Sequence, residues 1–104
     1  WYPVERFNEI GENRYMLSAL FTESVRNHPD SSDFNSNGWE DVITVEPKFA
    51  GGERFGLSGK SAGEHVQPGD TVALWFNLLA PASTDGSAKD NTYTIRVKIF
   101  AVSE

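Results

Sequence analysis

Apolar and polar residues alternate over the last part of the chain. Apolar side chains occupy every second position there, at Tyr93, Ile95, Val97 and Ile99. Threonine, arginine and lysine fill the positions between them. A period of two is expected of a strand that buries one of its two faces. The pattern therefore predicts a strand over residues 91–102.

A second strand is predicted over residues 71–79. It follows a Pro-Gly-Asp turn at residues 68–70 and ends before Pro81, because proline cannot donate to a ladder. Residues 80–91 are rich in Ser, Thr, Gly and Asp, a composition typical of a surface loop. Four apolar residues of this strand are expected to share one face: Val72, Leu74, Phe76 and Leu78.

Shorter patterns predict further strands in the first two thirds of the chain. Residues 41–46 alternate, and residues 54–58 and 64–67 are short candidates separated by glycines. Residues 4–10 and 15–22 flank a turn-like Gly-Glu-Asn sequence, which predicts a hairpin. The second arm of this hairpin also contains Met, Leu and Ala, which favour helix.

Together these segments predict about seven short strands, a number and spacing typical of an immunoglobulin-like sandwich. A chain of 104 residues fits one domain of ordinary size. We therefore expect an all-β fold of two antiparallel sheets, formed by a single domain over residues 1–104.

Composition narrows the functional classes. The hydrophobic fraction of 38% includes seven Phe and three Trp, enough large rings to build a core without disulfides. The chain has no cysteine, which excludes disulfides, thiolate zinc sites and cysteine nucleophiles. A net charge of −6 with scattered basic residues argues against nucleic acid as a partner. No apolar run is long enough to predict insertion into a membrane.

Oxygen-bearing side chains alternate over residues 33–41. Calcium takes about six to eight oxygen ligands, and this spacing aims several of them into one tight loop. Gly38 permits the bend, and the carbonyl of residue 39 can add a ligand. The predicted ligands are Asp33, Asn35, Asn37, Trp39 and Asp41.

This stretch resembles the calcium loops of integrin-type propeller repeats and of dockerins, which share an Asp-x-Asp-x-Asp-Gly-x-x-Asp form. The resemblance covers nine residues and implies calcium as a cofactor. The chain departs from that form at Asn35 and Asn37, which are neutral, so modest affinity is expected. The alternative is a surface turn held by Asx hydrogen bonds without an ion.

Residues 66–81 and 91–100 carry a broader resemblance. Their Pro-Gly-Asp turn, their strand ending in Ala-Pro and their closing strand resemble the last strands of immunoglobulin-like modules in bacterial and archaeal surface proteins and surface filaments. The resemblance implies a secreted or cell-surface setting. Members of that family serve as spacers, stalk units, polymerising subunits and glycan binders, so it does not fix one function.

The tryptophans are candidate binding residues. Trp75 has the opposite parity to its apolar neighbours, which would place its ring on the second face of the strand as a platform for a sugar or an apolar side chain. Trp39 and Trp1 are candidates to join it. The alternative is that Trp75 covers the outer surface of the sheet or that a bulge reverses the parity.

No catalytic residues are predicted. His28 and His65 stand alone in the sequence, without the spacing of metal ligands. Residues 56–61 share the end of a phosphate-binding loop, but Arg54 occupies the position of its first glycine. Small sandwiches also seldom enclose the cleft that a hydrolase needs.

The sequence thus predicts a non-catalytic structural or adhesive module, secreted or on a cell surface and stabilised by calcium. Its expected partners are other protein chains, including copies of itself, with residues 1–10 as an arm that completes the sheet of a neighbour. The alternative is a carbohydrate-binding module that uses exposed Trp residues to bind glycans.

Overall fold

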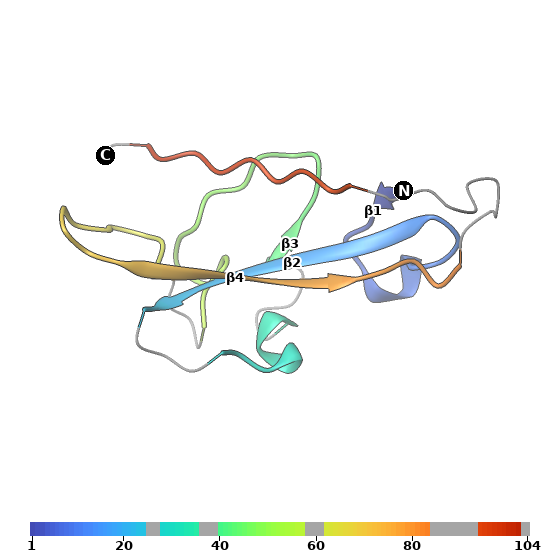
Figure 1. Ribbon diagram of the computed structural model, residues 1–104, viewed down its shortest axis with the longest axis horizontal. Coiled ribbons are helices and arrows are strands. Elements are labelled where there is room, and N and C mark those ends of the chain that lie inside the picture. The colour runs from blue at the N-terminus through green and yellow to red at the C-terminus, as the bar shows by residue number, and fades with distance from the viewer. Residues whose placement is uncertain (25–27, 36–39, 58–61, 84–93, 103–104) are drawn as a thin grey trace.

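A long central strand organises the computed structural model, which describes residues 1–24, 28–35, 40–57, 62–83 and 94–102. Strand β2 (Arg14–Glu23) pairs antiparallel with β4 (Val72–Leu79) over eight residues, as Figure 1 shows. The register places Met16 opposite Leu79 and Leu20 opposite Trp75. These two strands confirm the strand predictions for residues 15–22 and 71–79, and the helical alternative for the first of them is wrong.

Three short segments share the other edge of β2. Strand β1 (Tyr2–Pro3) runs parallel to its beginning, and β3 (Val42–Ile43) pairs antiparallel with Leu17 and Ser18. Beyond β3, the amide of Phe21 donates to the carbonyl of Phe55 at 2.9 Å. The described residues therefore form one mixed sheet of four strands, with β2 in the middle.

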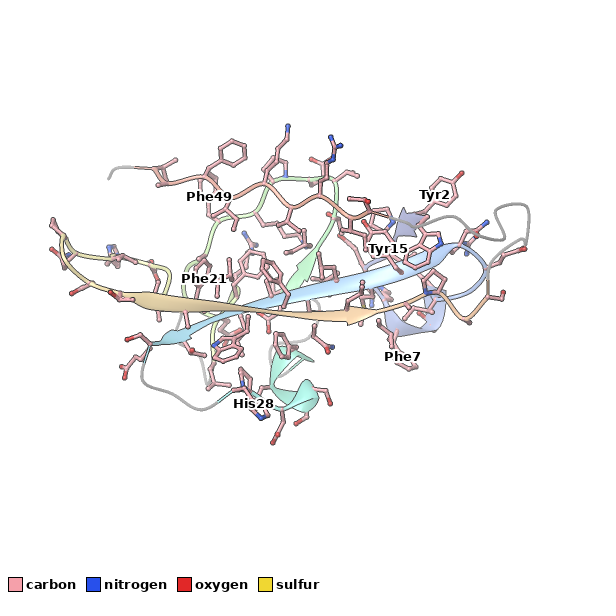
Figure 2. All side chains as sticks on the ribbon, in the orientation of Figure 1. Tyr2, Phe7, Tyr15, Phe21, His28 and Phe49 are labelled. Carbon is pink, nitrogen blue, oxygen red and sulfur yellow. The ribbon has the colours of Figure 1, made fainter. Side chains whose placement is uncertain are left out.

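The two faces of the sheet have different surroundings. One face carries Met16 and Leu79 and is covered by the 3₁₀ helices η1 (Phe7–Glu9) and η2 (Ser31–Asn35), and we call it the helix-covered face. Phe21 lies on the opposite side, which we call the second face; Figure 2 shows it on the other side of the sheet from Phe7.

A buried cluster holds the helix-covered face together. Met16 of β2 and Val42 of β3 pack with Val4, and Ile10 and Leu79 close the cluster from its sides. The amide of Val4 donates to the carbonyl of Tyr15 at 2.8 Å, which fixes the N-terminal segment on the sheet of its own chain. Burial of large apolar side chains is the main favourable contribution to folding here.

Several predicted elements differ from those observed. The strand predicted over 4–10 is wrong, since η1 forms there and β1 pairs in parallel, so no hairpin forms. The strand predicted over 41–46 shortens to Val42–Ile43. No named strand forms over 54–57 or 64–67, where turns and isolated bridges occur instead.

The C-terminal segment is the clearest difference. In its described part, residues 94–102, the chain is extended but belongs to no ladder, so the strand predicted over 91–102 is not formed there. Figure 1 shows this segment running along the length of the sheet and apart from it. Alternation gives the segment strand propensity, but a strand also needs a partner with free backbone groups beside it.

The all-β fold class is confirmed, because every regular element of the described chain other than two short 3₁₀ helices is a strand. The finer prediction of two antiparallel sheets with about seven strands stays a prediction. In the described ranges, no helix has the length and apolar character required to cross a bilayer.

Candidate functional site

The outer edge of β4 is the candidate functional site. Within the described residues, β4 pairs with β2 on one side and with nothing on the other. The amides of Ala19 and Phe21 donate to Asp41 and Phe55 across the far edge of β2, so the backbone groups of the even-numbered β2 residues point toward β4. The β4 residues opposite them therefore bond to β2; they are Ala73, Trp75, Asn77 and Leu79.

The other four residues of β4 therefore present their backbone groups to the unpaired side. Antiparallel strands alternate between residues that bond inward and residues that bond outward. The outward ones are Val72, Leu74, Phe76 and Leu78.

The side chains along this edge are apolar and partly exposed. Phe76 retains 44% and Leu78 48% of its possible exposure, on the second face. We call the outer edge of β4, together with these two side chains, the edge surface. Proteins usually protect an edge strand with lysine, proline or a bulge, because unpaired backbone groups attract other strands. The sequence of β4, VALWFNLL, contains no charged residue and no proline.

Trp75 lies on the helix-covered face of β4. Its Nε1 donates to Oγ1 of Thr22 at 2.8 Å, and Thr22 itself is buried. The indole is half-buried, so its ring is partly covered instead of standing free as a platform.

Trp1, another predicted binding residue, is not brought to Trp75. Trp1 is half-buried, and its ring lies 6.3 Å from that of Tyr15 at a tilt of 40°. Tyr15 lies five residues before Leu20, the partner of Trp75, which separates the two positions by about 17 Å along β2. Trp39 lies outside the described residues. Glycan binding through these residues stays a prediction.

The predicted calcium ligands are only partly described. Asp33 lies in η2, where its Oδ2 accepts a hydrogen bond from the amide of Asp30 at 3.0 Å, an Asx-type contact. Asn37 and Trp39 lie outside the described residues, as does the side chain of Asn35. In the part of the chain that is described, no three acidic or histidine side chains form a group that could hold a metal. Calcium binding stays a prediction.

Asp41, the last predicted ligand, has a structural role in the core. It is fully buried, and its Oδ1 accepts a hydrogen bond from the amide of Phe55 at 2.7 Å. Its carbonyl accepts one from the amide of Ala19 at 2.9 Å. Because Phe55 in turn bonds to Phe21, Asp41 fastens the loop of residues 54–56 to the edge of β2.

Burial changes the acidity of Asp41. Loss of hydration disfavours the charged carboxylate and raises its pKa from 3.8 to about 6. The amides of Phe55 and Gly56 oppose this rise, and the negative charge of Glu40 adds to it slightly. Its Oδ2 is buried and makes no hydrogen bond within the described chain.

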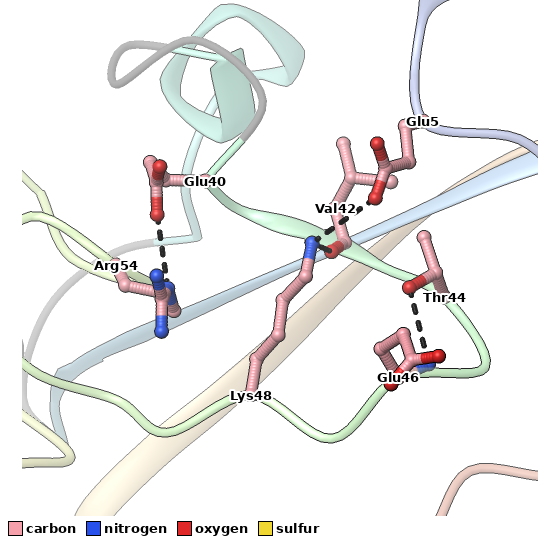
Figure 3. Close-up of polar contacts among 7 residues, drawn as sticks. All are labelled: Glu5, Glu40, Val42, Thr44, Glu46, Lys48 and Arg54. Carbon is pink, nitrogen blue, oxygen red and sulfur yellow. Dashed lines mark hydrogen bonds and ion pairs between the residues drawn. The ribbon is translucent and has the colours of Figure 1, made fainter.

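Ion pairs fasten the loops on either side of β3: the side chains of Arg54 and Glu40 are exposed, whereas that of Lys48 is half-buried. Arg54 Nε donates to Glu40 at 2.9 Å, and Lys48 Nζ donates to the carbonyl of Val42 at 2.7 Å while lying 3.9 Å from Glu5, as Figure 3 shows. Surface ion pairs contribute at most about 1 kcal/mol each. These contacts position the loops.

An open groove of about 330 Å³ lies between the helix-covered face and the two 3₁₀ helices. Among the described residues, no titratable side chain lines it: the lining residues are Phe7, Met16, Ser31, Ser32, Asn77 and Leu79. The two histidines are exposed in separate loops, where His28 contacts the carbonyl of Pro29 and His65 lies 3.3 Å from Glu64.

Comparisons with protein-family models, curated proteins and solved structures return no match to this chain. The geometry of the chain itself therefore carries the information about its function.

Sequence reasoning missed the edge surface. It identified β4 and the shared face of Phe76 and Leu78, but it placed the exposed position on the opposite face, at Trp75. Both faces of β4 are largely apolar, so parity alone cannot say which is covered. The available signal was the absence of charge and proline over eight consecutive residues.

Proposed function

We propose that this chain is a non-catalytic structural or adhesive module of a secreted or cell-surface protein. In this proposal it binds other protein chains, copies of itself included, through the edge surface. The supporting observation is that β4 combines an outer edge unpaired in the described chain with an uncharged sequence and two exposed apolar side chains. The extracellular setting is supported by the resemblance of residues 66–81 and 91–100 to surface modules.

Both parts of the edge surface favour a strand as the bound element. Each backbone hydrogen bond formed with a partner strand contributes about 0.5–1.5 kcal/mol. Covering the exposed halves of Phe76 and Leu78 adds about 1 kcal/mol for each side chain. An extended partner segment gains both contributions at once, because it pairs with the backbone while its side chains pack beside those of β4.

Sedimentation over a range of protein concentrations tests this proposal. The unmodified chain is expected to self-associate, and Leu78→Lys is expected to weaken the association at least about tenfold by placing a charge on the edge surface. Val45→Lys is the matched control, because Val45 is 83% exposed and lies outside β4. Circular dichroism checks that both variants fold. A chain that stays monomeric at every concentration, or equal effects of the two lysines, would refute a binding role for this edge.

The calcium prediction has its own test. If residues 33–41 bind calcium only in the folded chain, millimolar calcium raises the melting temperature by mass action, and a chelator reverses the shift. Magnesium at the same concentration controls for ionic strength. If calcium leaves the melting temperature unchanged, residues 33–41 do not form a calcium site.

A further inference from the structure

The C-terminal segment of residues 94–102 is an extended chain whose backbone belongs to no ladder. Its apolar side chains are largely in solvent: Ile99 is 65% and Phe100 74% exposed. An alternating segment of this kind is unusual as an isolated extended chain, because it leaves its backbone outside any ladder of the described chain and most of its apolar side chains exposed, although Ile95 is half-buried.

The edge surface also lacks a partner strand within the described chain. Four residues of β4 present backbone groups outward, beside the exposed side chains of Phe76 and Leu78. The segment of nine residues matches the eight residues of β4, a length of about 26 Å for a paired strand. If Ile95, Val97 and Ile99 take the second face, they lie beside the outward residues of β4.

Charge favours the same pairing. Arg96 and Lys98 give the segment a charge of +2, which leaves −8 on the rest of a chain whose net charge is −6. The segment of one copy is therefore attracted to the body of another, with an effect that salt weakens.

We propose that residues 94–102 of one copy add to the outer edge of β4 in a second copy as a further strand. This inference rests on the proposed function and names its partner and contact. The segment runs apart from the sheet, and no other described residue pairs with the segment or with the outer edge of β4, so both can pair with another copy. Because each copy carries one donor and one acceptor, the contact joins unlike surfaces, and repetition builds a chain of copies unless it closes.

The N-terminal arm does not supply this strand. The amides of Tyr2 and Val4 donate to Asn13 and Tyr15 of the same chain, and Val4 is buried in the core. Exchange of that arm would require the core cluster to open, whereas residues 94–102 have no ladder to break.

Disulfide trapping tests the contact directly, because the chain has no cysteine of its own. Two single-cysteine variants, Phe76→Cys and Val97→Cys, are distinguished by tags of different size, mixed and oxidised. In the control mixture, Val45→Cys replaces Phe76→Cys. A covalent heterodimer is expected at more than about tenfold the yield of this control, since two thiols held close together in a complex form a disulfide faster than thiols that meet only by diffusion.

Three results would overturn the inference. One is a heterodimer yield equal to that of the control. Another is preferential formation of Phe76→Cys homodimers, which would indicate that two β4 edges pair with each other. The last is a monomeric disulfide in the double variant Phe76→Cys/Val97→Cys without heterodimer in the mixture, which would place the segment on its own β4.

A proline variant separates this inference from the proposed function. Val97→Pro removes a backbone donor from the middle of the segment, so self-association should fall at least about tenfold. The unfolding midpoint of the monomer should stay unchanged, because this residue is in no ladder with the other described residues. If Leu78→Lys weakens association and Val97→Pro does not, the edge surface binds a different segment and only the present inference fails.

Discussion

Replacing Asp41 by Asn should stabilise the protein at neutral pH and remove a large part of the pH dependence of its stability. Asp41 is fully buried, and its pKa is raised from 3.8 to about 6 by loss of hydration. Asn keeps an Oδ1 that can accept the hydrogen bond from the amide of Phe55, and it carries no charge.

The magnitude follows from the size of the pKa shift. A rise of about two units corresponds to about 3 kcal/mol, since one unit is worth about 1.4 kcal/mol. The folded chain binds the proton more tightly than the unfolded chain. The unfavourable contribution of Asp41 is therefore absent below pH 3.8, grows as the pH rises, and is complete above about pH 6.

Part of the gain in the Asn variant is offset. Its Nδ2 takes the position of Oδ2, which has no hydrogen-bond partner in the described chain, and a buried donor without a partner costs about 1–3 kcal/mol. The protonated carboxyl of Asp41 places a donor at the same position, so the wild type shares this cost at low pH. We therefore expect a gain of about 1–2 kcal/mol at pH 7.5 and a difference of less than about 0.5 kcal/mol at pH 4. The growth of this gain with pH is the distinctive result.

Urea unfolding followed by tryptophan fluorescence at pH values between 4 and 8 measures this difference. The variant Asp70→Asn makes the same substitution at an exposed turn and should change stability by less than about 0.5 kcal/mol. Two results would refute the reasoning. One is a difference in the free energy of unfolding between wild type and Asp41→Asn that does not change with pH. The other is a wild type that becomes more stable relative to the variant as the pH rises.

Two further predictions concern the packing of β2. A Cβ at residue 63 would lie 2.6 Å from the ring of Phe21, so Gly63→Ala should lower the free energy of unfolding by about 1–3 kcal/mol. A Cβ at residue 11 would have nothing within 4 Å, so Gly11→Ala should change the free energy of unfolding by less than about 1 kcal/mol. Equal losses of stability in urea unfolding would contradict the close packing. Thr22→Val removes the acceptor for Trp75 Nε1 and should lower the free energy of unfolding by about 1–2 kcal/mol. The same substitution should have little effect when Trp75→Phe is already present. An undiminished loss of stability in that double-mutant cycle would show that the hydrogen bond is not its source.

The strands β2 and β4 could be predicted because their signal is local. Apolar side chains recur in the pattern of a strand, and a Pro-Gly-Asp turn precedes Val72 while Pro81 follows Leu79. The same local reasoning failed for residues 4–10, because a segment as short as β1 depends on the neighbour it pairs with.

The candidate site was much harder to predict. Asp41 was expected to be a calcium ligand from the spacing of oxygen atoms, which stays a prediction. The spacing did not indicate that Asp41 is buried and accepts a hydrogen bond from the amide of Phe55, fourteen residues away in the sequence. Parity left open whether the ring of Trp75 is exposed or covers the sheet, and it could not show that Trp75 hydrogen-bonds to Thr22, fifty-three residues away. Contacts of this kind join distant segments, and no local pattern encodes them.

The sequence by itself determined the strand propensity of residues 72–79 and 94–102, the lack of cysteine and the negative net charge. Only the tertiary structure decided that β2 satisfies one edge of β4, that the 3₁₀ helices cover the face of Trp75, and that the C-terminal segment belongs to no ladder in the described chain. The physical reason is that alternation specifies which side chains share a face, whereas the pairing of an edge depends on which backbone groups remain free once the rest of the chain has folded.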